Sequence, residues 1–211
     1  MTHSEQGGSY GQTQRDAAPP RRAGGAPAAI VCFIAVATLI VGLDLGIKYV
    51  TFERVAGQPI ALDAVDDPAE AVPWHPRVDL VPHVLSLRLT TNPGAVFGMW
   101  SGQRWLFITV SIAAVAVLLH LFWRSDARAW PYHLGLALVL GGALGNLYDR
   151  LRYGVVRDMF FLFPEMGIWP WIFNLADAAL MIGVGLVILM IYLRERQARQ
   201  QQLQAPQTDR A

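Results

Sequence analysis

The chain has 211 residues, of which 54% are hydrophobic and only 16% are charged. Its formal net charge of +1 excludes the strongly basic surface of a protein that binds nucleic acid. The apolar residues form long runs that a soluble core of this size would not need, which indicates an integral membrane protein. The single cysteine, Cys32, lies inside the first run, so we expect a buried thiol and no intrachain disulfide.

Four apolar segments approach the length that a helix needs to cross a bilayer. In chain order we predict them at about 26–50, 105–123, 132–147 and 171–193. The third is short and can span only if protein shields its polar end. The sequence therefore predicts an all-α integral membrane protein with four transmembrane helices.

The segments outside these helices complete the predicted organisation. Residues 1–25 are polar and rich in Gly, Ser, Gln and Pro, so we expect a disordered tail before a membrane domain at 26–193. Within that domain an external loop is expected at about 51–103. Partial strand-like alternation at 78–91 predicts a small β-containing element in this loop. Residues 194–211 form the predicted C-terminal tail.

Basic residues near the predicted helices indicate the orientation, because cytoplasmic flanks are enriched in Arg and Lys. Three flanks carry more arginines than acidic residues, whereas the loop at 51–103 is rich in carboxylates. Both termini are therefore predicted to be cytoplasmic. The arginines in question are Arg15, Arg21, Arg22, Arg124, Arg128, Arg194, Arg196 and Arg199.

With this topology, polar residues from distant parts of the chain collect near the external face. Asp44 and Lys48 lie four residues apart toward the end of the first helix, a spacing that favours an ion pair. A structural pair that anchors the helix end, with Lys48 reaching toward water, remains an alternative for them. The other members of this set are Asn92 and Gly94 before the second helix, Asn146, Asp149 and Arg150 at the end of the third, and Asn174 and Asp177 at the start of the fourth.

Asp158 and Asp177 are the candidate catalytic residues. A carboxylate near hydrocarbon costs about 2.5 kcal/mol or more, so such residues usually face the protein interior and have a function. Two carboxylates that share one proton can act as the acid and base of an aspartic protease. Asn174 could also serve as a helix cap. Asp177 lies one turn beyond the ordinary capping position, so we expect a functional role for it rather than a capping role. No His or Cys is placed to bind a metal and no serine has a nearby base, so we expect neither a metal nor a cofactor.

Four blocks of the sequence, in order, resemble the bacterial lipoprotein signal peptidase family, signal peptidase II. They are "DLGIK" from Asp44, "TNPGAVFG" from Thr91, "GGALGNLYDRLRYGVVRDMF" from Gly141 and "FNLADAALMIG" from Phe173. The resemblance places the catalytic aspartates of the family on Asp158 and Asp177. It places the polar residues that support them on Asp44, Lys48, Asn92, Asn146, Asp149, Arg150 and Asn174, and Gly94 within the second block allows close approach of another chain.

The resemblance implies a membrane-embedded aspartic endopeptidase of the bacterial inner membrane. Its substrate would be a prolipoprotein, cleaved on the N-terminal side of a cysteine that already carries diacylglycerol. Membrane lipid and the inhibitor globomycin are further expected partners. Asn92 and Asn146 would bind the substrate backbone, Asn174 would orient the catalytic pair, and Arg150 would hold Asp149 or a substrate carbonyl.

Two other classes of function remain as alternatives. A small transporter or ion-pathway protein could use intramembrane carboxylates as a charge relay. It would be expected to carry charges at mid-membrane and internal repeats, and neither is evident. A structural membrane subunit could use its acidic groups only to bind a partner. Loss of processing after a single Asp→Asn change would separate the peptidase from both.

Overall fold

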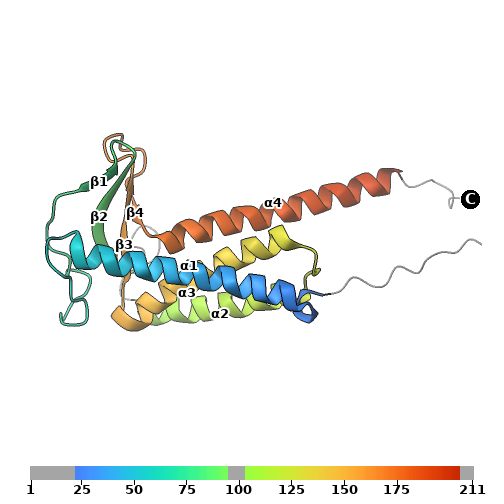
Figure 1. The fold of residues 1–211 in the computed structure, drawn as a ribbon, viewed down its shortest axis with the longest axis horizontal. Coiled ribbons are helices and arrows are strands. Elements are labelled where there is room, and N and C mark those ends of the chain that lie inside the picture. Colours follow the sequence, from blue (N-terminus) through green and yellow to red (C-terminus); the bar gives the residue numbers. More distant parts are fainter. Residues whose placement is uncertain (1–21, 95–102, 205–211) are drawn as a thin grey trace, which may run out of the picture.

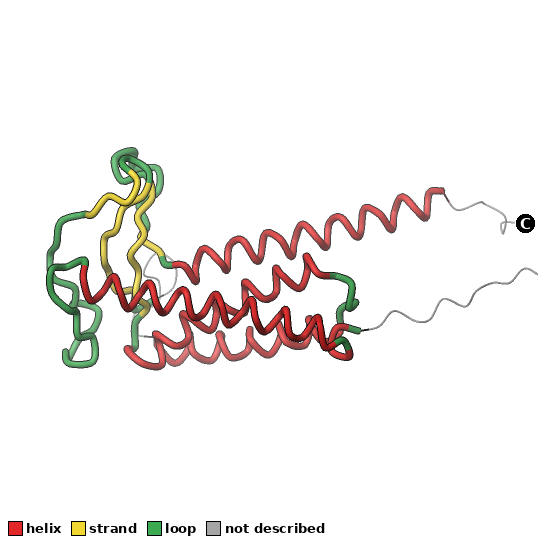
Figure 2. The backbone as a smooth tube through the Cα atoms, in the orientation of Figure 1, coloured by secondary structure: helices red, strands yellow, loops and turns green. Residues whose placement is uncertain are grey.

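The long helices run lengthwise, with a small sheet at one end (Figures 1 and 2). The computed structural model describes residues 22–94 and 103–204. The helices are α1 (Pro27–Arg54), α2 (Arg104–Arg124), α3 (Trp130–Tyr153) and α4 (Leu175–Gln204). Three of them, α1, α2 and α4, are long and apolar enough to cross a membrane, and α3 is not among these three. A mainly helical membrane protein is therefore confirmed, with three candidate spans rather than four.

Helix α3 is the central helix of the bundle, because it packs against each of the other three. Small residues on α3 permit this close packing. A Cβ atom at Gly142 would lie 2.4 Å from the backbone oxygen of Ala176 on α4. A Cβ atom at Gly145 would lie 2.6 Å from a carboxylate oxygen of Asp44 on α1. Glycine at these two positions thus lets α1 and α4 bring polar groups up to the backbone of α3.

The sheet has four antiparallel strands in the order β1-β2-β3-β4. They are β1 (Val78–Val81), β2 (Leu85–Asn92), β3 (Val156–Leu162) and β4 (Ile172–Phe173). The predicted β-element at 78–91 is confirmed as the hairpin of β1 and β2. Strands β3 and β4 were not predicted, so the all-α description is wrong for the segment between the third and fourth helices.

Apolar packing determines which way β3 faces. Met159 is fully buried in a cluster that includes Phe52, Leu87 and Leu89. Because successive side chains of a strand point to opposite faces, Asp158 points away from this cluster. There it meets residues from the helix ends.

Several boundaries differ from the prediction. Helix α3 continues to Tyr153, and α4 begins at Leu175 because residues 172–173 belong to the sheet. Helix α4 also runs through the predicted C-terminal tail as far as Gln204. Residues 1–21 and 205–211 lie outside the described residues. Disorder up to residue 25 is wrong for Ala23–Gly25, which form a 3-10 turn held by a hydrogen bond from the backbone N–H of Ala23 to the carbonyl of Ser125.

Cys32 does not occupy the protein core. Its side chain is exposed on the surface of α1. On a helix that can span a membrane, such a position suits an apolar thiol because hydrocarbon surrounds it. The expectation of burial within the protein was therefore wrong.

Candidate active site

Asp158 lies on β3 and is only 2% exposed. Its Oδ1 atom accepts a hydrogen bond of 2.6 Å from the side-chain amide of Asn174. Its Oδ2 atom accepts a longer one, 3.4 Å, from the amide of Asn92 on β2. The strand pairing places Thr90 opposite Asp158, which brings the end of β2 beside the carboxylate. Amide donors on two other elements therefore hold this carboxylate in place.

Asp177 lies in the first turn of α4, where it forms a capping box with Asn174. The side-chain oxygen of Asn174 accepts the N–H of Asp177 at 2.9 Å, and Oδ2 of Asp177 accepts the N–H of Asn174 at 3.3 Å. Such reciprocal bonds satisfy two backbone donors at a helix start. The cap predicted at Asn174 is confirmed, whereas the expectation that Asp177 has little part in capping was wrong. The Asn146 amide also donates to Oδ1 of Asp177 at 2.7 Å.

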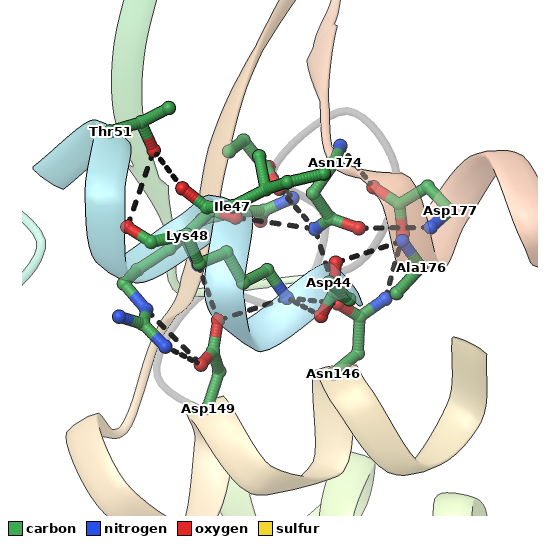
Figure 3. Close-up of polar contacts among 12 residues, drawn as sticks. Asp44, Ile47, Lys48, Thr51, Asn146, Asp149, Asn174, Ala176 and Asp177 are labelled. Carbon is green, nitrogen blue, oxygen red and sulfur yellow. Dashed lines mark hydrogen bonds and ion pairs between the residues drawn. The ribbon is translucent and has the colours of Figure 1, made fainter. Parts of the chain in front are cut away.

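Asn174 therefore joins the two aspartates. Figure 3 shows its contact with Asp177 beside Asn146 and Lys48. Its side chain is fully buried, and its nitrogen also approaches the side-chain oxygen of Asn146 at 3.1 Å and the carbonyl of Arg157 at 3.3 Å. Every polar atom of this side chain thus has a partner within the site. A side chain with so many bonds has one orientation, which fixes the Asp158 carboxylate and the backbone N–H of Asp177.

Lys48 is the cation at the centre of the site. Its Nζ atom lies 2.7 Å from Oδ2 of Asp44, 3.1 Å from Oδ2 of Asp149 and 3.1 Å from Oδ1 of Asn146. The side chain is 0% exposed, so the alternative in which Lys48 reaches toward water is wrong. The other carboxylate oxygen of Asp44 accepts the N–H of Ala176 at 2.9 Å, which attaches α1 to the start of α4.

Besides Lys48, Asp149 is paired with Arg157 and not with Arg150. The Nε and Nη2 atoms of Arg157 approach Oδ1 of Asp149 at 3.2 and 2.8 Å, and its backbone N–H donates to Oδ2 at 3.0 Å. Arg150 instead donates from Nη2 to the carbonyl of Gly94 at 3.2 Å, and its guanidinium lies over the ring of Phe107. The expected Arg150–Asp149 contact is thus wrong.

Arg157 is a residue of the site that the sequence analysis did not single out. Its position directly before Asp158 was visible, but the loop also held Arg150 and Arg152. In a strand, neighbouring side chains point to opposite faces, so adjacency to Asp158 alone does not place Arg157 in the site. The side chain nevertheless reaches the site through Asp149, which lies between it and Lys48.

Asn146 does not fit the expected role of binding substrate backbone. It is buried, it donates to Asp177, and its oxygen accepts from both Lys48 and Asn174. Asn92 donates to Asp158 while its oxygen accepts the N–H of Gly94 at 3.0 Å, which shapes the turn after β2. Residues 95–98 of the second sequence block lie outside the described residues.

The structure thus brings the predicted site residues together at the sheet end of the bundle. Direct contacts join them from α1, α3, α4 and the two central strands of the sheet. They are Asp44, Lys48, Asn92, Gly94, Asn146, Asp149, Arg150, Asp158, Asn174 and Asp177.

Burial has a chemical consequence for Asp158. Loss of water around its carboxylate, and secondarily the charge of Asp177, raise the pKa of Asp158 to about 8. Asp177 is only partly buried and accepts hydrogen bonds at a helix N-terminus, where negative charge is favoured. Asp158 can therefore stay protonated at neutral pH, as the acid of an acid–base pair must.

The fold of apolar helices with a small sheet at one end is similar to that of two solved bacterial membrane enzymes. A bacterial membrane enzyme solved by the in meso method at 2.3 Å is similar over 86% of this chain and 94% of its own, with a TM-score of 0.63 and 25% identity. Another bacterial membrane enzyme, solved by the same method at 1.9 Å, is similar over 77% of this chain and 93% of its own, with a TM-score of 0.61 and 27% identity.

The sequence comparisons identify the family. The profile described as signal peptidase (SPase) II matches residues 36–193, so the chain belongs to the signal peptidase II family. The lipoprotein signal peptidase of Desulfitobacterium hafniense (strain Y51) is 39% identical over 122 residues, which are 58% of this chain and 78% of the relative. That of Latilactobacillus sakei subsp. sakei (strain 23K) is 44% identical over 117 residues, 56% of this chain and 76% of the relative. The chain is thus a membrane peptidase.

Proposed function

We propose that this chain removes signal peptides from prolipoproteins as an aspartic endopeptidase, cleaving on the N-terminal side of a diacylglyceryl-modified cysteine. Membership of the signal peptidase II family supports the reaction and the class of substrate. The observation that carries the chemistry is that Asn174 binds both carboxylates, that of Asp158 through its side-chain amide and that of Asp177 through its backbone N–H. Two carboxylates fixed by one residue can act together on one peptide bond.

Asp158 carries the proton in the resting enzyme, because it is the more buried of the two and its pKa is raised. Ionised Asp177 takes a proton from water as the water oxygen attacks the scissile carbonyl carbon. Asp158 donates its proton to the carbonyl oxygen, which gives a neutral gem-diol intermediate. The C–N bond then breaks as Asp177 gives its proton to the leaving nitrogen and Asp158 takes the proton of one gem-diol hydroxyl. The products are a carboxylic acid and a free amine, and both aspartates return to their starting protonation states.

Helix α3 serves as the fourth transmembrane helix. Its 24 residues extend about 36 Å, enough to cross the hydrocarbon core. The surrounding helices bury much of its surface, including Asn146 and Asp149, so these polar groups need not meet lipid. Placement between protein neighbours supports a span that composition alone would not identify.

Both termini are cytoplasmic and the site lies near the external face. The arginines at the start of α1, in the α2–α3 connection and after Leu193 support this orientation. The sheet and the site lie at the opposite end of the helices from these arginines (Figure 1). A lipidated cysteine would hold its scissile bond at that depth while its acyl chains stay in the bilayer.

The buried charges argue against an ion pathway. They gather at the sheet end of the helices and are paired with one another there, whereas a relay across the membrane needs charges at mid-depth.

The proposed function is tested with purified protein and a matched pair of precursors, one diacylglyceryl-modified and one unmodified, with and without EDTA. Each buried methylene of the lipid contributes roughly 0.8 kcal/mol, so the lipidated precursor should be cleaved much faster. Globomycin should inhibit and EDTA should not. Equal rates on the two precursors would refute lipoprotein specificity, and inhibition by EDTA would refute a metal-free mechanism.

A further inference from the structure

The charges of the ionisable groups in the site sum to zero only when the Asp158–Asp177 pair holds one proton. Positive charges come from Lys48, Arg150 and Arg157, and negative charges come from Asp44 and Asp149. The remaining pair, Asp158 and Asp177, must then hold one negative charge for the group to be neutral. This condition is met when the pair holds one proton, the state that hydrolysis by two aspartates requires. In a buried site an unbalanced charge is costly, so the cations help to determine the proton count.

Arg157 is buried and held by several contacts. It is 5% exposed, its guanidinium and backbone N–H together make three contacts with the Asp149 carboxylate, and the guanidinium lies 4.7 Å from the ring centre of Tyr153. These contacts attach β3 to the end of α3 at the residue next to Asp158. The carbonyl of Arg157 also accepts a bond from the amide that binds Asp158.

We propose that Arg157 is a positioning residue for the peptidase reaction, which fixes β3 to α3 through Asp149 and supplies the positive charge that lets the Asp158–Asp177 pair keep a single proton. The inference rests on the proposed function. Arg157 does not touch the reacting groups and acts through Asp149, Lys48 and Asn174.

Removal of the Arg157 charge would disturb the site in a defined way. Asp149 would keep only Lys48 as a positively charged partner. Lys48 is also paired with Asp44, so one cation would neutralise two buried carboxylates. The site would then carry one excess negative charge. The aspartate pair would release its shared proton at a higher pH, because a second negative charge on it would cost more. Removal of the Asp149 charge leaves an excess positive charge and has the opposite effect.

The experiment measures the pH dependence of kcat/KM on a lipidated precursor for Arg157→Met, Arg157→Lys, Asp149→Asn and the double variant Asp149→Asn/Arg157→Met. In the pH profile of kcat/KM, activity declines along an alkaline limb. This limb should move to higher pH by at least about half a unit in Arg157→Met and to lower pH in Asp149→Asn. The double variant should return the limb to its wild-type position, because the charges balance again.

Arg157→Lys separates charge from geometry. It keeps the positive charge but loses the planar fork, so the limb should stay in place while kcat falls several-fold with little change in KM. Arg152→Met is the matched control, because Arg152 forms an exposed ion pair with Asp63 outside the site. It should leave both the limb and the rate unchanged.

A merely structural role for Arg157 would lower rates without moving the limb in opposite directions. The inference is therefore overturned if the limbs of Arg157→Met and Asp149→Asn do not move, or move the same way. Circular dichroism in detergent shows whether Arg157→Met folds. If it does not, the double variant tests the inference, since its alkaline limb must lie at higher pH than that of Asp149→Asn. Failure of the wild-type protein to cleave the lipidated precursor would instead refute the proposed function itself.

Discussion

The side-chain amide of Asn174 donates to the carboxylate of Asp158 over 2.6 Å, from a fully buried position at the start of α4 to the middle of β3. This bond connects the helical bundle to the sheet at the site. The same asparagine caps α4, so the structure of the helix start and the geometry of the aspartate pair depend on one side chain.

Asn174→Ala should lower kcat/KM by at least about 100-fold, because misplaced catalytic groups lose that much. It should also destabilise the fold by about 1 kcal/mol through loss of the cap. Asn174→Ser separates these effects, since serine caps a helix but is too short to hold Asp158. We expect near wild-type thermal stability and low activity in the serine variant. High activity in Asn174→Ser would show that capping is the whole role of Asn174.

Asp158→Asn and Asp177→Asn should each lower the rate by about 10³-fold or more, because asparagine neither accepts nor supplies the proton. The amide has nearly the shape of the carboxyl group, so both variants should still fold. The measurement is initial-rate cleavage of a lipidated precursor together with circular dichroism. Asp63→Asn is the control that should keep full activity, because Asp63 forms an exposed ion pair with Arg152 outside the site. Substantial cleavage by Asp158→Asn would contradict the assignment.

The raised pKa of Asp158 predicts how stability varies with pH. Its carboxyl titrates near 3.8 in the unfolded chain and at about 8 in the folded protein, so between these values the folded state binds the proton more tightly. The stability that this group contributes is therefore complete below about pH 4 and is lost as the pH rises toward 8.

Asparagine at 158 does not titrate, so the melting temperature of Asp158→Asn relative to wild type should rise between pH 5 and about 8. Thermal unfolding of both proteins in one detergent measures this difference. Parallel melting temperatures across the range would show that Asp158 releases its proton normally. Wild-type activity should also decline above about pH 8, as the aspartate pair loses its shared proton.

Arg150→Lys tests whether the guanidinium shape of Arg150 matters. Arg150 donates to the Gly94 carbonyl and lies over Phe107, and lysine keeps the charge without the planar fork. We expect cleavage to fall about tenfold, because the turn that follows β2 is less well fixed. Arg124→Lys, at the far end of α2, is the matched control. A wild-type initial rate in Arg150→Lys would exclude a geometric role for the guanidinium.

Much of the site could be predicted from the sequence because its signals are local. Asp44 and Lys48 are four apart on one helix, and Asn174 and Asp177 are three apart at a helix start, so their proximity follows from helical geometry. Hydrophobic run length identified three of the spanning segments directly. The four motifs in order identified the family, which the profile match confirms.

Tertiary structure alone decided the rest. The strand character of 156–162 depends on pairing with β2, and that pairing joins residues about 70 positions apart, which no local pattern encodes. The choice of Arg157 over Arg150 as the partner of Asp149 depends on how β3 crosses the end of α3. Burial of Lys48 depends on glycines that let three helices approach closely. The sequence thus determined which groups are present and which end of the helices they share. Long-range packing determined their partners, because desolvation and hydrogen bonding depend on the neighbours that only the folded chain supplies.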